Sequence, residues 1–261
     1  MPRWAHDTVD VMGVQVSVAD VSLFRRFLGE AVRTREQLLV SIANPNYVMA
    51  AQRDVGLREN INSFDLNLAD GWGVVLAARV LGRRLPSRMA VDDLTDDLFG
   101  PAAEGAWRVY LLGCAPGVAP KAGDNVEKWY PGVHIVGTQH GHWGAVDGRI
   151  PAAHADRLVA EINEVKPDIM LVGLGTPLQQ AFIMENRDRL EVPVMMTCGA
   201  YFEHLAERRE WYPGWVLKLR IGFLYRFYRD PKRLWYRYTV ELGSYLLRLA
   251  SFRLRSRRRP T

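Results

Sequence analysis

The chain of 261 residues is 48% apolar, 24% charged and 10% aromatic, which is typical of a folded soluble protein with one large domain and an appendage. No segment approaches the roughly 20 apolar residues of a membrane-spanning helix, and the N-terminus lacks a signal-peptide pattern, so we expect neither. The net charge of +5 is uneven: residues 216–261 hold 13 Lys and Arg against two acids, so this tail carries +11 and the rest −6.

The first part of the chain alternates short apolar runs with amphipathic stretches. The pattern predicts, in order, a strand at 14–18, a helix at 21–32, a strand at 38–43, a helix at 47–52, a strand at 66–69 and a helix at 74–81. Pro45 fixes its own φ and suits the first turn of the second helix.

The second part repeats this alternation more cleanly. It predicts a strand at 108–112, a helix ending at 129, a strand at 133–136, a helix at 152–165, a strand at 169–172, a helix at 177–190 and a strand at 192–196. Such alternation predicts an α/β fold, with a parallel sheet covered by helices on both faces. Ligands of such sheets bind outside the carboxyl ends of the strands. One rim should therefore hold the residues that follow the apolar runs: Asn44, Asp70, Gly113, Gly137, Gly173 and Gly199.

The tail differs in character from the rest of the chain. Two predicted helices, at 215–228 and 231–254, are rich in Trp, Tyr, Phe, Leu and Arg. We therefore divide the chain into a domain at 1–212 and an appendage at 213–261. Basic, aromatic helices suit an anionic membrane surface. The alternatives are nucleic acid or a solvated helix on the surface of the body.

Asp70 follows a predicted strand and precedes Gly71 and Gly73. Glycines let the backbone turn tightly beside a ligand, and a carboxylate at the rim can act as a general base. An aspartate before a helix can also serve only as its N-cap. The sequence leaves both interpretations of Asp70 open.

Two glycine-rich turns follow other strands, at 113–117 and 173–177. The second resembles a dinucleotide-binding fingerprint but fails it, because Leu178 occupies the last glycine position. The free N–H groups at the start of the following helix would still suit a diphosphate. Each turn alone is a weak signal, since glycine-rich turns are common in parallel sheets.

Metal ligands are not evident in the sequence. Four acids cluster at Asp92, Asp93, Asp96 and Asp97, yet no Asp-x-Asp triplet occurs, and they suit the first turn of a helix. The pair His140 and His142 lacks a third ligand, and the two cysteines, Cys114 and Cys198, predict reduced thiols in a core. We therefore expect no metal and no cofactor.

Five motifs in chain order resemble the WecG/TagA/CpsF family, also called glycosyltransferase family 26, over most of the chain. They are Asn44-Pro45-Asn46, Ala69-Asp70-Gly71-Trp72-Gly73-Val74, Arg88 with Asp93-Leu94, Leu111-Leu112-Gly113 with Pro116-Gly117-Val118-Ala119, and Val172-Gly173-Leu174-Gly175 with Pro177-Leu178-Gln179-Gln180. The tail adds Leu224-Tyr225-Arg226, Asp230-Pro231-Lys232-Arg233-Leu234-Trp235 and Arg237-Tyr238. Each motif is unspecific alone, whereas the ordered set is specific.

The resemblance implies a Rossmann-like fold and an inverting transfer of a sugar from a UDP-sugar to a polyprenyl-diphosphate-linked saccharide in the synthesis of a bacterial surface polysaccharide or wall polymer. It implies a cytoplasmic protein, peripheral on the anionic inner face of the membrane, that binds no nucleic acid; a homo-oligomer is compatible with it. Asp70 takes the role of catalytic base. The substrate-binding residues carried over from the family are Asn44, Arg88, Gln179, Gly113, Gly173, Gly175, Arg226, Arg233 and Arg237.

The chain departs from the family's pattern at Ile42, Val91, Glu203 and Gly222, so the resemblance implies the reaction but not the donor sugar. Two other classes of function remain as alternatives. A nucleotide-dependent oxidoreductase is disfavoured by the broken glycine fingerprint. A non-catalytic membrane-associated adaptor on the same fold is disfavoured by the retention of Asp70 and Gln179.

Overall fold

The structure is a computed structural model that describes residues 3–145, 148–207, 222–229 and 241–257, with the single residues 216, 231, 235 and 239. Its strands are β1 (Thr8–Val11), β2 (Val14–Ser17), β3 (Leu38–Ala43), β4 (Leu66–Ala69), β5 (Arg108–Gly113), β6 (His134–Gln139), β7 (Ile169–Gly173) and β8 (Val194–Thr197). Its helices are α1 (Val21–Thr34), α2 (Pro45–Arg53), α3 (Val55–Asn62), α4 (Trp72–Val80), α5 (Thr95–Glu104), α6 (Val118–Trp129), α7 (Ala152–Glu164), α8 (Leu178–Asn186), α9 (Tyr201–Glu207), α11 (Gly222–Arg229) and α13 (Leu242–Arg257).

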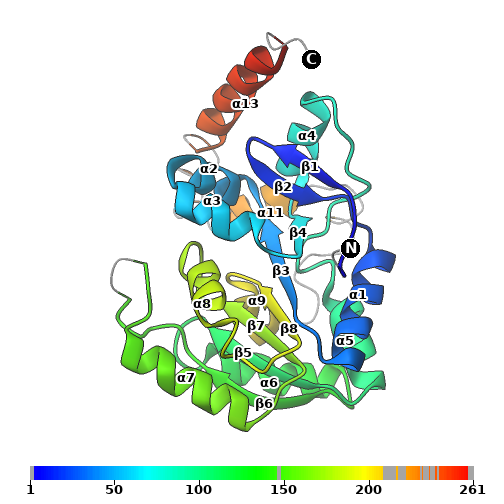
Figure 1. Ribbon diagram of the computed structural model, residues 1–261, viewed down its shortest axis with the longest axis vertical. Helices are drawn as coiled ribbons and strands as arrows, with labels where there is room; N and C mark the ends of the chain where they lie inside the picture. Colours follow the sequence, from blue (N-terminus) through cyan, green and yellow to red (C-terminus); the bar gives the residue numbers. More distant parts are fainter. Residues whose placement is uncertain are drawn as a thin grey trace.

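Six of the described strands form one parallel sheet in the order β4-β3-β8-β7-β5-β6 (Figure 1). The inner strands β3, β7 and β8 are buried along their whole length, which explains why their sequences are continuous apolar runs rather than alternating ones. The predicted α/β fold with a parallel sheet is confirmed.

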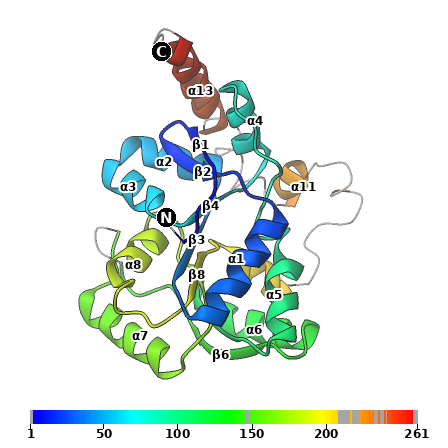
Figure 2. The same cartoon turned by 45° about the vertical axis from the view of Figure 1, so that its right-hand side comes forward.

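Helices cover both faces of this sheet (Figures 1 and 2). Side chains that alternate along the strands point to opposite faces. In β3, Leu38 and Val40 belong to the core under α1, α5, α6 and α9. Leu39 belongs to the second core, under α7 and α8. The alternation divides most of the apolar residues of the sheet between these two cores.

A third core lies beyond the β4 edge of the sheet. It joins the antiparallel hairpin β1–β2 to α2, α3 and α4, and it takes Tyr245 and Leu249 from α13. Figures 1 and 2 both show α4 and α13 at the end of the molecule that carries this hairpin. The C-terminal helix therefore packs on the body next to α4.

Local sequence signals explain the starts of four of the described helices, α1, α2, α3 and α5. Asp20, Asn44 and Asp54 each cap a helix with a side-chain oxygen, and Pro45 occupies the first turn of α2 as predicted. Asp96 and Asp97 lie in the first turn of α5, where acids interact favourably with the helix dipole.

One prediction about the rim is wrong. Gly137 lies inside β6 rather than at its end, and the strand continues to Gln139. A Cβ atom on Gly137 would lie 2.4 Å from the Tyr110 ring. This glycine is therefore explained by the packing of an aromatic ring on the sheet.

Candidate active site

Two neighbouring strands bring Asn44 and Asp70 together. Ala43 and Ala69, the last residues of β3 and β4, are partners in the parallel register. The backbone N–H of Asp70 continues the pairing and donates to the carbonyl oxygen of Ala43 at 2.8 Å. The two predicted site residues thus start the turns at adjacent strand ends.

Asp70 does not occupy the N-cap position of the helix that follows it. That position belongs to Gly71, which has φ of 84° and no side chain that could cap. A Cβ atom on Gly71 would have no neighbour within 4 Å, so the turn beside Asp70 is open on that side. The geometry therefore disfavours the interpretation of Asp70 as the N-cap of α4.

Asn44, in contrast, is a helix cap. Its side-chain oxygen accepts the backbone N–H of Tyr47 at 3.0 Å and so closes the first turn of α2. One lone pair of the oxygen is therefore used by the helix, and the NH₂ group of Asn44 is left to donate to a substrate.

The turns that carry these two residues contact one another. A Cβ atom on Gly73 would lie 2.6 Å from the Cγ atom of Pro45, so only glycine permits this approach. The contact gives Gly73 and Pro45, which stand beside Asp70 and Asn44 in the two sequence motifs, a shared structural role.

Arg88 reaches the same end of the sheet through its chain neighbour. The backbone N–H of Met89 donates to the carbonyl oxygen of Ala69 at 2.8 Å, directly before Asp70. The Arg88 guanidinium forms an ion pair with Asp93, and the two side chains are 23% and 32% exposed. A partly exposed cation therefore lies beside the strand end that carries the proposed base.

The other predicted site glycines have a different environment. A Cβ atom on Gly113 would lie 2.4 Å from the Gly173 backbone, and one on Gly173 would lie 2.5 Å from the Gly199 carbonyl oxygen. These glycines allow the ends of β5, β7 and β8 to approach closely. Gly175 differs, because its φ is 78° and its missing side chain would face open space.

The side chain of Gln179 connects two turns of the rim. It is only 5% exposed, and its side-chain oxygen accepts the backbone N–H of Gly199 at 3.2 Å. Its NH₂ group lies 3.5 Å from the hydroxyl of Thr176. The contacts give Gln179 a positioning role between the turns after β7 and β8.

A buried polar network lies beneath Asn44 and was not predicted. The Tyr47 hydroxyl shares a hydrogen bond of 2.5 Å with Ser41 and donates to Asn67 at 3.2 Å, and Ser41 also contacts Thr197 at 3.2 Å. Burial raises the pKa of Tyr47 well above its ordinary value, so this hydroxyl stays protonated. The network ties the start of α2 to three strands of the sheet. In sequence these residues look like ordinary strand and helix positions.

Two further unpredicted contacts join the segment after Arg88, which includes the start of α5, to α9. His204 Nδ1 lies 2.6 Å from the Asp92 carboxylate, and the Thr95 and Tyr201 hydroxyls lie 2.7 Å apart. The partners are more than a hundred residues apart in the chain, so no local motif reveals them.

The four clustered acids diverge to separate partners. Asp92 contacts His204, Asp93 contacts Arg88, Asp96 accepts from the Tyr130 hydroxyl, and Asp97 pairs with Arg25 at 2.5 Å. Among the described residues, no three His, Cys, Asp or Glu side chains gather as metal ligands would.

The two cysteines are free thiols in the structure. Cys114 is partly buried and Cys198 is buried. Burial, with a smaller contribution from the nearby Glu203, raises the pKa of Cys114 to about 11. Cys114 is therefore a protonated thiol near neutral pH rather than a nucleophile.

The described part of the tail reaches the site through α13. The Tyr245 hydroxyl donates to the carbonyl oxygen of Gly73 at 3.2 Å. The side chain of Arg226, on α11, and all of Arg233 and Arg237 lie outside the described residues. Among the described helices, none has both the length and the apolar character needed to cross a membrane.

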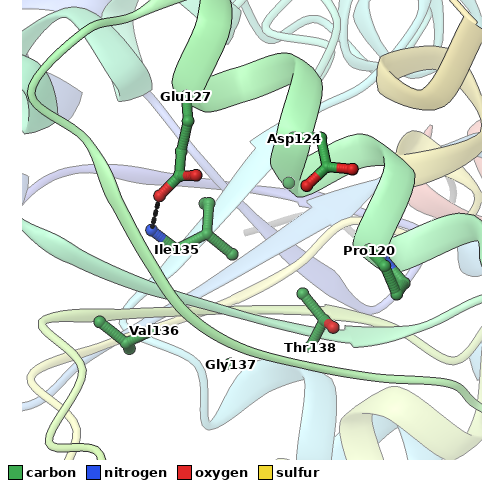
Figure 3. Close-up of a pocket in the computed structure, with 8 residues that line it drawn as sticks. Pro120, Asp124, Glu127, Ile135, Val136, Gly137 and Thr138 are labelled. Atoms are coloured by element: carbon green, nitrogen blue, oxygen red, sulfur yellow. Dashed lines mark hydrogen bonds between the residues drawn. The ribbon is translucent and has the colours of Figure 1, made fainter.

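A separate hollow of about 220 Å³ lies between α6 and the edge strand β6 (Figure 3). It is lined by Pro120, Gly123, Asp124, Glu127, Ile135, Val136, Gly137 and Thr138. The Glu127 carboxylate accepts the backbone N–H of Ile135 there at 2.9 Å. Since β6 and β4 are opposite edges of the sheet, this hollow is remote from Asp70.

Comparison with known proteins places this site in context. Residues 9–259 match the model of the "Glycosyl transferase WecG/TagA/CpsF family". An N-acetylglucosaminyldiphosphoundecaprenol N-acetyl-beta-D-mannosaminyltransferase from Bacillus subtilis (strain 168) is 29% identical over 195 residues, 75% of this chain and 73% of that protein. A protein of the same name from Staphylococcus aureus (strain MW2) is 30% identical over 230 residues, 87% of this chain and 86% of that protein.

Proposed function

This chain belongs to the glycosyl transferase WecG/TagA/CpsF family, and we propose that it transfers a sugar from a UDP-sugar to a polyprenyl-diphosphate-linked saccharide, with inversion at the anomeric carbon. The names of the two relatives support the acceptor class, because both describe transfer to N-acetylglucosaminyl-diphosphoundecaprenol. We propose that the product enters a bacterial surface polysaccharide or wall polymer.

The proposed reaction is a single displacement. An acceptor hydroxyl oxygen forms a bond to the anomeric carbon of the donor while the bond from that carbon to the diphosphate oxygen breaks. Asp70 takes the proton of the acceptor hydroxyl as general base. UDP leaves with the bonding electron pair, and its added negative charge needs cationic partners.

Three features of the chain are proposed to stabilise the leaving diphosphate. Arg88 supplies a cation beside the end of β4, where the Met89 hydrogen bond holds it. The turn at Gly175 is open to a ligand and directly precedes α8. We assign the same role to the tail arginines Arg226, Arg233 and Arg237, from their match to the family motif.

We also propose that the protein works as a peripheral protein on the inner face of the cell membrane. The polyprenyl chain of the proposed acceptor is confined to a bilayer, so the enzyme must meet it there. The tail carries +11 and many aromatic side chains, and basic residues near an anionic membrane surface contribute about 1 kcal/mol each.

The observation that supports this function best is the geometry at Asp70. Asp70 follows the carboxyl end of a strand, Asn44 follows the paired end of the adjacent strand, and the N-cap position of the following helix belongs to Gly71. A general base fits this place in a parallel sheet better than a structural cap does.

The Asp70→Asn variant tests the proposal. We expect it to fold normally and to lose transfer activity by about 10²- to 10⁴-fold, the usual contribution of a general base. Asp20→Asn is the matched control, because Asp20 is a helix N-cap and asparagine caps about equally well. The assay combines UDP-sugars with a short-chain polyprenyl-diphosphate-sugar acceptor and detects the product by mass spectrometry.

The outcomes separate the proposed function from its competitors. An Asp70→Asn variant that melts like the parent and keeps more than about a tenth of the rate is inconsistent with general-base catalysis. A parent that binds membranes but turns over no UDP-sugar would support the non-catalytic adaptor. Binding of NAD(P) in a titration would favour the oxidoreductase.

A further inference from the structure

The helix that follows Asp70 exposes an apolar face to solvent. Trp72, Leu76 and Val80 of α4 are 41%, 51% and 38% exposed, and their spacing of four residues places them on one side of the helix. We call these three residues the α4 stripe. The opposite side of α4, with Val74 and Ala77, is buried in the core beneath the hairpin.

The adjoining helix α13 has the same organisation. Its inner side buries Tyr245 and Leu249 in the core shared with α4. Its outer side exposes Leu242, Leu246, Leu247 and Leu254. Figures 1 and 2 show α4 and α13 at the same end of the molecule.

Positive charge lies at the C-terminal end of the α4 stripe. Arg79 lies on α4, and Arg83 and Arg84 follow the end of that helix; all three are exposed. Soluble proteins rarely expose several large apolar side chains together without a binding partner. An apolar stripe bordered by arginines is complementary to one surface in particular, an anionic lipid headgroup layer over acyl chains.

The position of the stripe agrees with the chemistry of the site. Trp72, its first residue, is two positions from Asp70, so a lipid surface in contact with the stripe would lie beside the carboxyl rim. An acceptor held in the bilayer by its polyprenyl chain exposes its sugar at this surface. Contact through α4 would therefore bring the acceptor hydroxyl toward Asp70 without lifting the lipid out of the membrane.

We propose that the α4 stripe is a second membrane-contacting element, in the body of the protein, in addition to the basic tail. Trp72, Leu76 and Val80 enter the interfacial layer, and Arg79, Arg83 and Arg84 contact anionic headgroups. The benefit to catalysis rests on the proposed function, whereas lipid binding through α4 does not.

The test is a double variant, Leu76→Glu with Val80→Glu, which places two acids on the exposed face and leaves the buried face intact. The matched control is Val21→Glu with Val55→Glu, two apolar residues on α1 and α3 that are 37% and 57% exposed. Both variants change the net charge equally. Flotation with phosphatidylcholine vesicles containing about one third phosphatidylglycerol measures binding near the charge density of an anionic membrane.

We expect the α4 variant to bind these vesicles about ten-fold more weakly than the control, because two apolar side chains no longer enter the bilayer. An equal loss in both variants would mean that negative charge alone weakens binding, and it would overturn the proposal. Unchanged binding together with conversion of a dimer to a monomer, measured by sedimentation, would also overturn it and assign the stripe to a second copy of the chain.

Turnover separates this proposal from the proposed function. The α4 variant should match the parent on a water-soluble acceptor analogue and fall behind it on an acceptor embedded in vesicles. An equal rate on the embedded acceptor, at protein concentrations below saturation of the vesicles, would contradict the role of α4. If the parent turns over neither acceptor, the proposed function fails, and the flotation result still decides whether α4 binds lipid.

Discussion

The carboxyl rim of the sheet has two halves that differ in what occupies them. At the β3 and β4 ends, the turns carry polar side chains, namely Asn44, Asp70 and, beside them, Arg88. At the β5, β7 and β8 ends, backbone meets backbone, and Gly113 and Gly173 leave no room for a side chain. One half of the rim presents functional groups, while the other half is built for close approach.

The difference shows that glycine is needed at different strand ends for different reasons. Gly71 and Gly175 have positive φ values and open space where a Cβ atom would point, which suits a turn around a ligand. Gly113 and Gly173 are instead required by their neighbours in the protein. In the sequence, all four simply look like glycines after apolar runs. Four tests probe this contrast, in order of decreasing expected effect.

Replacing Gly113 with alanine should have the largest effect. The added Cβ atom would overlap the Gly173 backbone, and φ at Gly113 is 144°. Backbone cannot move aside as a flexible side chain does, so overpacking and strain together should cost about 3 kcal/mol of unfolding free energy. Urea denaturation measures this loss, and activity should fall with it.

Gly29→Ala on α1 is the matched control, because a Cβ atom there has no neighbour within 4 Å. In a helix interior this change should be neutral or stabilising by up to about 1 kcal/mol. Equal midpoints for the Gly113 and Gly29 variants would refute the close-packed description of the β5 and β7 ends.

Replacing Arg226 and Arg233 together with alanine tests whether the tail completes the polar half of the rim. On a water-soluble acceptor analogue we expect turnover to fall by about 10²-fold, because the leaving diphosphate loses cationic partners. Removing residues 253–261 is the control, because it spares both arginines and the buried Leu249, and it should weaken vesicle binding more than soluble turnover. If the double variant turns over the soluble analogue as fast as the parent does, the tail serves only to bind the membrane.

Gln179→Ala tests whether that residue belongs to the close-packed half of the rim. Its loss leaves the Gly199 N–H without its acceptor, which should cost about 1–3 kcal/mol of stability. Gln139→Ala is the control. It also removes a side-chain hydrogen bond, but its partner Glu161 keeps the hydrogen bond that it accepts from the Tyr110 hydroxyl. A KM for the donor that rises ten-fold or more at unchanged stability would instead place Gln179 in the substrate pocket.

Excess EDTA should leave the rate of sugar transfer unchanged, and this is the smallest expected effect of the four tests. The prediction follows from the lack of an Asp-x-Asp triplet in the sequence, and arginines are proposed to supply the positive charge. A loss of activity that Mg²⁺ or Mn²⁺ restores would contradict it. Asp92, Asp93, Asp96 and Asp97 would then need to be examined by substitution.

The fold and the common rim of Asn44 and Asp70 were accessible from the sequence, whereas the adjacency of their strands was not. Continuous apolar runs separated by amphipathic stretches indicate a parallel sheet, and parallel strands end at one rim. The sequence indicated only the first turn of α5, and it did not predict the hairpin strand β1 or the helices α3 and α9. They are short, and their burial depends on distant partners such as the hairpin contact with α4.

The contacts that arrange the site were not predictable. The Met89 hydrogen bond that brings Arg88 to β4, and the pair His204 and Asp92, join segments without any local signal. The same holds for the network around Tyr47, whose members look like ordinary core positions. That Asp70 is not the N-cap of α4 is evident only from the position and backbone conformation of Gly71.

The pairing of β3 with β8 has a consequence for how the protein is made. Leu38 pairs with Val194, so the centre of the sheet cannot close until most of the chain has left the ribosome. At about 5–20 residues per second, β3 waits roughly 10–30 s for its partner. During that interval an apolar strand has an unpaired edge and risks association with other chains. We expect refolding of this protein to be slow and sensitive to its concentration.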